Sequence, residues 1–191
     1  MNGAAEGFFE LKRHVSLVGM MGCGKTLIGG ILARKLNVPL VDTDREIEIA
    51  EERSIAEVFA SAGEAYFRDC EHRVLASAVS SKPCVIATGG GSYVFARNRR
   101  LIDESGVAVF LSTAPEILWK RIGADPATGG QRPGAKSWKT LDDFRRVLEE
   151  RDPCYNLANV TVRTSRYSSP EAVATAVWLK VKAHVQLELM D

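Results

Sequence analysis

The chain has 191 residues, of which 46% are hydrophobic and 26% are charged, and its formal net charge is +1. These values are ordinary for a soluble globular protein, and the near-neutral charge gives no reason to expect a nucleic acid or an anionic membrane as a partner. The length suits one domain over residues 1–191, and no apolar run approaches the roughly 20 residues of a membrane span.

The start of the chain and its cysteines both favour a cytoplasmic protein. The first residues, MNGAAEGFFELKRH, lack the apolar core of a secretory signal. Cys23, Cys70, Cys84 and Cys154 are widely spaced and form no C-x-x-C pair. We therefore expect reduced thiols rather than disulfides or a zinc site.

Strand-like and helical runs alternate along the chain. The expected strands are Val15–Val18, Pro39–Val41, Pro83–Ala87, Val107–Leu111 and Asn159–Val162. The expected helices are Lys25–Leu36, Asp44–Ala50, Ser54–Ala62, Glu64–Ser80, Val94–Asp103, Pro115–Ile122, Leu141–Glu150 and Pro170–Leu189. This alternation predicts a three-layer α/β/α fold with a five-stranded parallel sheet. In such sheets the ligand lies beyond the carboxyl ends of the strands.

The sequence GMMGCGKT, residues 19–26, follows the first expected strand and opens the first expected helix. It fits G-x-x-x-x-G-K-[ST], a loop whose backbone N–H groups wrap a polyphosphate at a helix N-terminus. Lys25 would reach the β and γ phosphates, and the Thr26 hydroxyl would bind Mg²⁺. The alternative is a glycine-rich turn that binds nothing, but the context favours a nucleoside triphosphate site.

Two carboxylates, Asp42 and Asp44, come directly after the second strand. Like charges this close are unfavourable without a cation or a hydrogen-bonding ligand. One could orient water on Mg²⁺, and the other could accept a proton from a substrate hydroxyl. Capping of the next helix explains one of the two carboxylates, but not both.

Arg68 and Glu71 lie three residues apart on one helical face, so Glu71 can orient the guanidinium. An oriented arginine suits bidentate capture of a small carboxylate. A surface ion pair explains the pattern equally well. After the third strand, Gly89, Gly90 and Gly91 suggest a backbone that a second substrate approaches closely. Arg151 adds a second arginine near the same crevice.

The segment Gly123–Ser137 is rich in glycine, proline and polar residues, and it is long for a connection in a compact domain. It is either a disordered insertion or a mobile lid. Arg132 in its middle favours the lid, because closure would bring a cation to the transferring phosphoryl group.

Taken together, these residues closely resemble the shikimate kinases of the P-loop kinase superfamily, which is nucleoside-monophosphate-kinase-like. The matching pieces run in the family's order over nearly the whole domain: GMMGCGKT, VDTDREIE, SIAEVFASAGEAYFRDCE, VIATGGGS, PEILWKR, QRPG, RDPCY and SSPEAV. The resemblance implies a P-loop NTPase fold, with residues 1–13 as an N-terminal extension and 123–138 as the lid. It implies ATP-dependent phosphorylation of the 3-hydroxyl of shikimate, a step toward chorismate and the aromatic amino acids, by a monomer.

The resemblance also implies a role for each matching site residue. Asp44 would bind substrate hydroxyls and act as the base, while Asp42 would touch Mg²⁺ through water and Thr26 would bind it. Arg68 and Arg151 would hold the shikimate carboxylate, with Glu71 bracing Arg68. The remaining acceptor contacts would be Phe59, Phe67, Gly89, Gly90 and Gly91. Lys25 and Arg132 would stabilise phosphoryl charge, and the ATP contacts would be Gly22, Cys23, Gly24, Lys25, Thr26, Leu27, Arg121, Arg132 and Pro170.

The lid departs from the family's usual Arg-Pro-Leu-Leu, because Gly134 and Ala135 follow Arg132-Pro133. Two further interpretations stay open. One is a related small-molecule kinase of the gluconate type. The other is a kinase-like binding protein that has lost catalysis, against which the presence of Lys25, Asp44 and Arg132 speaks.

Overall fold

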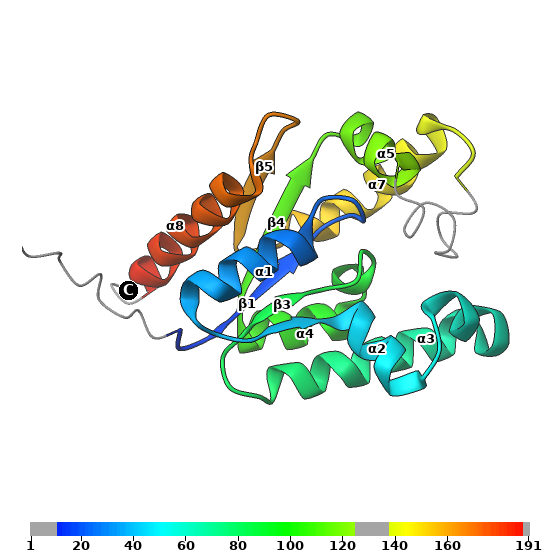
Figure 1. Cartoon of the computed structure of the whole chain (residues 1–191), viewed down its shortest axis with the longest axis horizontal. Coiled ribbons are helices and arrows are strands. Elements are labelled where there is room, and N and C mark those ends of the chain that lie inside the picture. The colour runs from blue at the N-terminus through cyan, green and yellow to red at the C-terminus, as the bar shows by residue number, and fades with distance from the viewer. Residues whose placement is uncertain (1–10, 125–137, 189–191) are drawn as a thin grey trace, which may run out of the picture.

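The computed structural model describes residues 11–124 and 138–188. Its centre is a five-stranded, all-parallel sheet with the strand order β2-β3-β1-β4-β5 (Figure 1). The strands are β1 (His14–Val18), β2 (Leu40–Asp42), β3 (Val85–Ala87), β4 (Gly106–Thr113) and β5 (Val160–Thr164). The predicted fold class is therefore confirmed. Because β1 lies between β3 and β4, the chain leaves β1 at the point where the strand order reverses, which is where ligands bind in such sheets.

Helices cover both faces of the sheet. They are α1 (Lys25–Leu36), α2 (Thr43–Glu51), α3 (Ile55–Val79), α4 (Ala96–Ser105), α5 (Pro115–Ala124), α7 (Leu141–Tyr155) and α8 (Pro170–Glu188), with the short 3₁₀ turn η1 (Ser92–Val94). In Figure 1, α1 and α8 lie side by side over one face, and α4 and α7 lie on the other. Because helices cover both faces of the sheet, β1 is buried along its whole length and β4 along most of its length.

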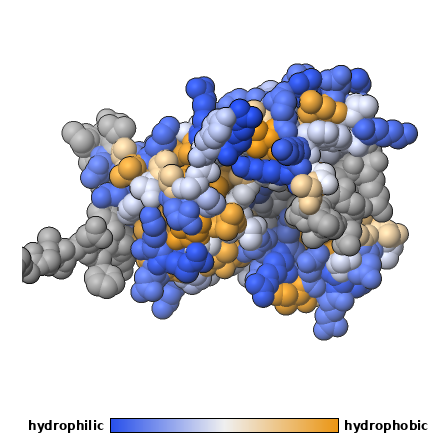
Figure 2. Space-filling model, turned by 45° about the horizontal axis from the view of Figure 1, so that its top comes forward, coloured by the Kyte–Doolittle hydropathy of each residue, from blue (hydrophilic) through white to orange (hydrophobic). Residues whose placement is uncertain are grey.

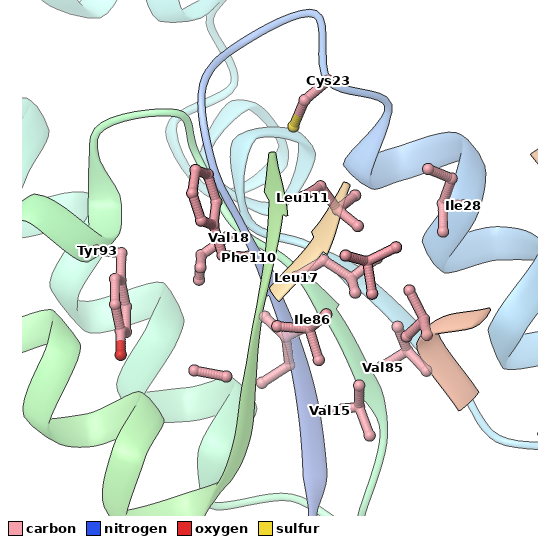
Figure 3. Close-up of a cluster of buried hydrophobic side chains, with 14 of the residues drawn as sticks. Val15, Leu17, Val18, Cys23, Ile28, Val85, Ile86, Tyr93, Phe110 and Leu111 are labelled. Carbon is pink, nitrogen blue, oxygen red and sulfur yellow. The ribbon is translucent and has the colours of Figure 1, made fainter. Parts of the chain in front are cut away.

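The core is made of side chains that leave the central strands in both directions (Figure 3). Leu17 and Val85 face α1, where they lie next to Gly29. A Cβ on Gly29 would come within 2.9 Å of Leu40 Cδ1, so this glycine lets α1 lie close to the sheet. Phe110 packs on the opposite side, where its ring stacks on Tyr155 at 5.1 Å between centroids. The close fit of α1 fixes the loop that precedes it.

Helix α3 is broken at Gly63, whose φ of 80° and ψ of 176° are not helical. The sequence predicts this break, because the expected helices end at Ala62 and restart at Glu64. A capping box, in which Ser54 and Glu57 bond reciprocally to each other's backbone N–H, begins the helix. The break turns the first half of α3 so that Ile55 and Phe59 line the same pocket as Phe67 from the second half.

Helix α7 continues five residues beyond the Glu150 at which we expected it to end, through Pro153 to Tyr155. We expected the helix to end before Pro153 because a proline normally ends or kinks a helix, and that expectation was wrong. Here the last turn is anchored by the fully buried Tyr155, whose hydroxyl donates a hydrogen bond to the Gly90 carbonyl. Arg151 therefore projects from a helix rather than from a loop.

Most of the predicted lid, including Arg132 and Pro133, lies outside the described residues. Of its ends, Gly123 belongs to α5, and Trp138 is buried against the Phe144 ring at 5.2 Å between centroids. Figure 2 shows hydrophobic residues in separate patches between hydrophilic side chains. Among the described helices, none is long and apolar enough to cross a membrane.

Candidate functional site

The loop between β1 and α1 has the backbone that phosphate binding requires. Gly19, Gly22 and Gly24 have φ values of 132°, 81° and 95°, a region that L side chains rarely adopt. Gly24 is the N-cap of α1 and makes no side-chain cap. The N–H groups at the start of α1 and its positive dipole end are thus available to an anion.

Lys25 is buried beneath this loop and donates to three atoms of it. Its Nζ lies 2.8 Å from the Gly19 carbonyl, 3.1 Å from the Met20 carbonyl and 3.7 Å from the Cys23 sulfur. These contacts hold the ammonium against the backbone of the loop. Two of these partners are neutral carbonyls, so an anionic phosphate can compete for the ammonium.

Thr26 and Asp42 meet at the edge of the loop. The Thr26 hydroxyl donates to Asp42 Oδ2 at 2.5 Å, while Oδ1 of the same carboxylate caps α2 by accepting from Asp44 N and Arg45 N. Asp42 is therefore the capping aspartate and also a neighbour of the loop. Within residues 11–124 and 138–188, no group of three or more His, Cys, Asp or Glu side chains could hold a metal ion.

A hollow lies on the outer side of the loop, between α5, the end of β5 and the start of α8. It is lined by Gly22, Cys23, Gly24, Leu27, Ile28, Arg121, Thr164, Ser165, Ser168, Pro170 and Val173. Arg121 Nη1 donates to the Gly22 carbonyl at 3.1 Å, which fixes the guanidinium next to the loop. The structure thus brings Arg121 and Pro170, which are both predicted ATP contacts, to one pocket beside the loop.

A pocket lies on the other side of the loop, between the loop, α3 and α7. It gathers all the predicted acceptor residues: Asp44, Phe59, Phe67, Arg68, Glu71, Gly89, Gly90, Gly91 and Arg151. Met21, Ile55 and Trp138 complete the wall and were missed by the sequence analysis. Helical spacing from Phe59 could have found Ile55, whereas Met21 and Trp138 carry no local signal.

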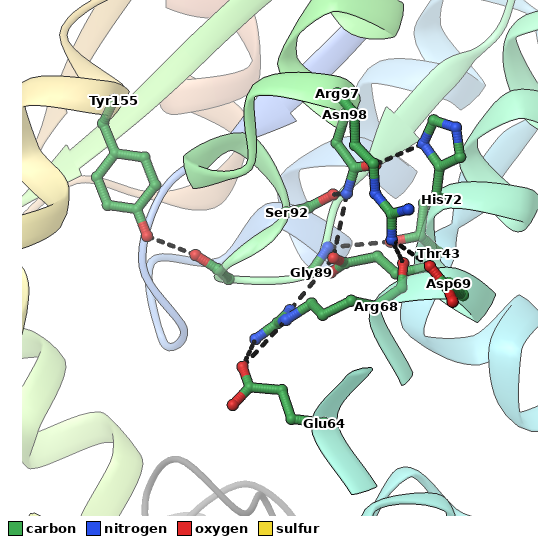
Figure 4. Close-up of polar contacts among 12 residues, drawn as sticks. Thr43, Glu64, Arg68, Asp69, His72, Gly89, Ser92, Arg97, Asn98 and Tyr155 are labelled. Carbon is green, nitrogen blue, oxygen red and sulfur yellow. Dashed lines mark hydrogen bonds and ion pairs between the residues drawn. The ribbon is translucent and has the colours of Figure 1, made fainter. Parts of the chain in front are cut away.

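Arg68 lies in this pocket and pairs with two carboxylates (Figure 4). Its Nη1 donates to Glu71 at 3.2 Å, as the sequence predicts, while Nε and Nη2 donate to one oxygen of Glu64 at 3.2 and 3.0 Å. Only 17% of the Arg68 side chain is exposed, compared with 64% of Glu64 and 1% of Glu71. This burial favours the orienting pair over the alternative of a plain surface ion pair.

Glu71 is buried, and its two carboxylate oxygens differ in their hydrogen bonding. Asn98 Nδ2 donates to Oε2 at 3.2 Å, but Oε1 has no hydrogen-bond partner among the described residues. Burial raises the pKa of Glu71, and the positive charge of Arg68 opposes this rise. A Cβ on Gly89 would lie 2.8 Å from both Glu71 Oε1 and Asp44 Oδ1. The two carboxylates therefore flank the glycine turn at the pocket wall.

The glycine turn after β3 is held from both sides. Gly89 N donates to the Thr43 hydroxyl at 2.9 Å, and the Gly90 carbonyl accepts from Tyr155. A Cβ on Gly90 would lie 3.0 Å from Met21 N. The turn thus lies against the loop between β1 and α1, so a ligand in this pocket would lie next to a ligand on that loop.

Three comparisons with known proteins agree with this geometry. The model of the family described as shikimate kinase matches residues 21–182. A shikimate kinase from Cereibacter sphaeroides is 46% identical over 155 residues, which cover 81% of this chain and 76% of the relative. A structure of shikimate kinase from Acinetobacter baumannii in complex with shikimate has a TM-score of 0.85 and 33% identity, covering 92% of this chain and 96% of that one.

A gluconokinase from Sinorhizobium meliloti is also similar in structure, with a TM-score of 0.58 and 15% identity over 96% of this chain and 99% of that one. At this identity the likeness shows the fold alone. The family match spans most of the chain, and the pocket gathers the residues to which the resemblance assigns acceptor contacts. The chain belongs to the shikimate kinase family.

Proposed function

We propose that this protein transfers the γ-phosphoryl group of ATP to the 3-hydroxyl of shikimate, which gives shikimate 3-phosphate and ADP and serves aromatic amino acid biosynthesis. The observation that carries the proposal is one pocket beside a phosphate loop, lined by two arginines, Arg68 and Arg151, and one aspartate, Asp44. Shikimate carries a carboxylate at one end of its ring and hydroxyls at the other. The pocket offers cations for the first and a carboxylate for the second.

On the donor side, the backbone N–H groups of the loop and the N-terminus of α1 hold the phosphates. Lys25 leaves the Gly19 and Met20 carbonyls and donates to the β and γ phosphates as ATP enters. Arg121 and Pro170 enclose the base in the outer pocket. We assign Arg132 to the transferring phosphoryl group because its place in the sequence matches the lid arginine of the family.

The residues at the loop edge fit a magnesium ion. The Thr26 hydroxyl and the Asp42 carboxylate are hard oxygen donors only 2.5 Å apart. Mg²⁺ typically takes one or two protein oxygens and completes its shell with water and substrate phosphates. Thr26 would bind the ion directly and Asp42 through water, and the ion would supply neutralisation of phosphate charge.

On the acceptor side, Arg68 and Arg151 hold the carboxylate of the ring, so that the opposite hydroxyls face Asp44. Asp44 accepts the proton of the attacking hydroxyl while the new oxygen–phosphorus bond forms and the bond to ADP breaks. Phe59 and Phe67, whose ring centroids are 4.5 Å apart, supply the apolar wall. Gly89–Gly91 let the ring approach the backbone.

We further propose that the protein works as a monomer in the cytoplasm. In support of the compartment, Cys23, Cys70, Cys84 and Cys154 are all free thiols. Light scattering of the purified protein tests the oligomeric state, with the mass of one chain expected and the mass of two chains contradicting the proposal.

The test is ADP release by the purified protein with Mg-ATP and shikimate, quinate or gluconate as acceptor. We expect release with shikimate that depends on its concentration and is far greater than with the other two acids. ATP binding without shikimate-dependent release would support the non-catalytic alternative. Faster release with gluconate would support the gluconate-type alternative.

A further inference from the structure

The guanidinium of Arg68 lies near two aromatic rings from different parts of the chain. Its Cζ is 5.1 Å from the centroid of the Phe67 ring and 4.5 Å from that of Phe95. Phe67 is buried in the pocket wall, whereas Phe95 comes from the junction between η1 and α4 and is 37% exposed. Both distances are within the range of a cation–π contact.

The position of Phe95 is fixed by contacts that do not involve its ring. Its N–H donates to the Ser92 carbonyl at 3.3 Å, and its own carbonyl accepts from Asn98 N at 3.0 Å. Two residues further on, Arg97 Nη2 donates to the Arg68 carbonyl at 2.8 Å and to Asp69 at 2.7 Å. The backbone that carries Phe95 is thus tied to the helical turn that carries Arg68.

The start of α4, which follows Phe95, also binds Glu71, the carboxylate that pairs with Arg68. Asn98 is buried, and its Nδ2 donates to Glu71 Oε2 and to the Ser92 hydroxyl, both at 3.2 Å. Its Oδ1 lies 2.9 Å from His72 Nδ1. Figure 4 shows Arg97 and Asn98 reaching from α4 toward the residues of α3. The start of α4 therefore contacts both members of the Arg68–Glu71 pair.

A ring near a guanidinium restricts its rotation and excludes water without using any N–H donor. Hydrogen-bonding neighbours such as Glu64 and Glu71 do occupy donors. We propose that Phe95 is a positioning residue of the acceptor site: it holds the Arg68 guanidinium in the orientation that receives the acceptor carboxylate. This inference rests on the proposed function, because it takes Arg68 as the ligand of that carboxylate.

The test is a set of steady-state measurements on the full chain with shikimate varied at saturating ATP. Phe95→Ala should raise the shikimate KM by about two- to five-fold, the size of one partly exposed cation–π contact. The kcat and the KM for ATP should stay at the wild-type values. Phe95→Tyr, which keeps the ring, should restore the KM, whereas Phe95→Leu should not.

Tyr66 provides a matched control, since it is also 37% exposed and its ring lies 5.8 Å from Cζ of Arg73, an arginine outside the acceptor pocket. Tyr66→Ala should leave the shikimate KM unchanged. The variant Arg68→Ala/Phe95→Ala should have the same kcat/KM as Arg68→Ala alone, because Phe95 acts only through Arg68.

A wild-type KM in Phe95→Ala and Phe95→Leu, together with a raised KM in Arg68→Ala, would overturn this inference and leave the proposed function standing. An equal loss from Phe95→Ala with and without Arg68 would overturn it as well. A wild-type KM in Arg68→Ala itself would instead remove the proposed carboxylate site, and this inference with it.

Discussion

Replacing Arg68 by lysine keeps the positive charge of the acceptor pocket but removes the planar fork. In the structure, Nε, Nη1 and Nη2 of Arg68 all donate to carboxylates, with distances of 3.0–3.2 Å. A lysine ammonium cannot hold Glu64, Glu71 and an incoming carboxylate in one plane. A hydrogen bond to a charged group contributes about 1.5–3 kcal/mol, so we expect the shikimate KM to rise about 10- to 100-fold.

Replacing Arg68 by methionine also tests the burial of Glu71. The Glu71 side chain is 1% exposed, so losing its cation leaves a buried carboxylate unpaired. Such losses cost about 3–5 kcal/mol in fully buried pairs, and the partial exposure of Arg68 reduces our expectation to ~2 kcal/mol. Glu71→Gln in the same chain should recover at least half of this loss, since it removes the stranded charge.

The effects on the shikimate KM and on the free energy of unfolding can be measured with one set of proteins. ADP release with shikimate varied at saturating ATP gives the KM, and urea unfolding gives the free energy of unfolding. Arg73→Lys on the same helix is the control, because Arg73 lies outside the acceptor pocket. The reasoning is refuted by an unchanged shikimate KM in Arg68→Lys. It is also refuted if the double variant is no more stable than Arg68→Met.

Three further changes test other parts of the site. Asp44→Asn should abolish turnover while ATP affinity, measured by calorimetry, stays within about two-fold; a large loss of ATP affinity would contradict the role of Asp44 as the base. Gly89→Ala should raise the shikimate KM, because its Cβ would lie 2.8 Å from two carboxylate oxygens, whereas Gly30→Ala meets no atom closer than 3.6 Å and should leave the KM unchanged. Burial raises the pKa of Glu71, so the native state binds its proton at a higher pH than the unfolded chain. The stability of the wild type relative to Glu71→Gln should therefore fall as pH rises from about 4.3 through the raised pKa, and a rising difference in urea unfolding would contradict the raised pKa.

The sequence predicts the sheet and its helices well because their signals are local. Apolar runs bounded by turn residues mark the strands, and the break at Gly63 follows from a glycine between two helical patterns. The end of α7 could not be predicted in this way. Local rules place a helix end near Pro153, but the buried Tyr155 and its hydrogen bond to Gly90 extend the helix through a contact 65 residues away in sequence.

The residues of the candidate site could likewise be predicted only where the signal is local in sequence. Motif spacing found Lys25, Asp44 and Arg68, since each follows a strand or lies on one helical face. Glu64 escaped notice although it is four residues before Arg68, and the rule that suggested Glu71 could have found it. Phe95 and Trp138 reach the site only through tertiary packing, so no sequence pattern points to them.

The most direct measurement of the central claim is phosphorus NMR of the product formed from shikimate and Mg-ATP by the wild-type chain. Our account predicts one new phosphate monoester on the 3-hydroxyl of shikimate, formed in equal amount to ADP. It also predicts that the product is absent when Asp44→Asn replaces the wild type. ADP formation without a phosphorylated shikimate, or a phosphate on another hydroxyl, would contradict the account.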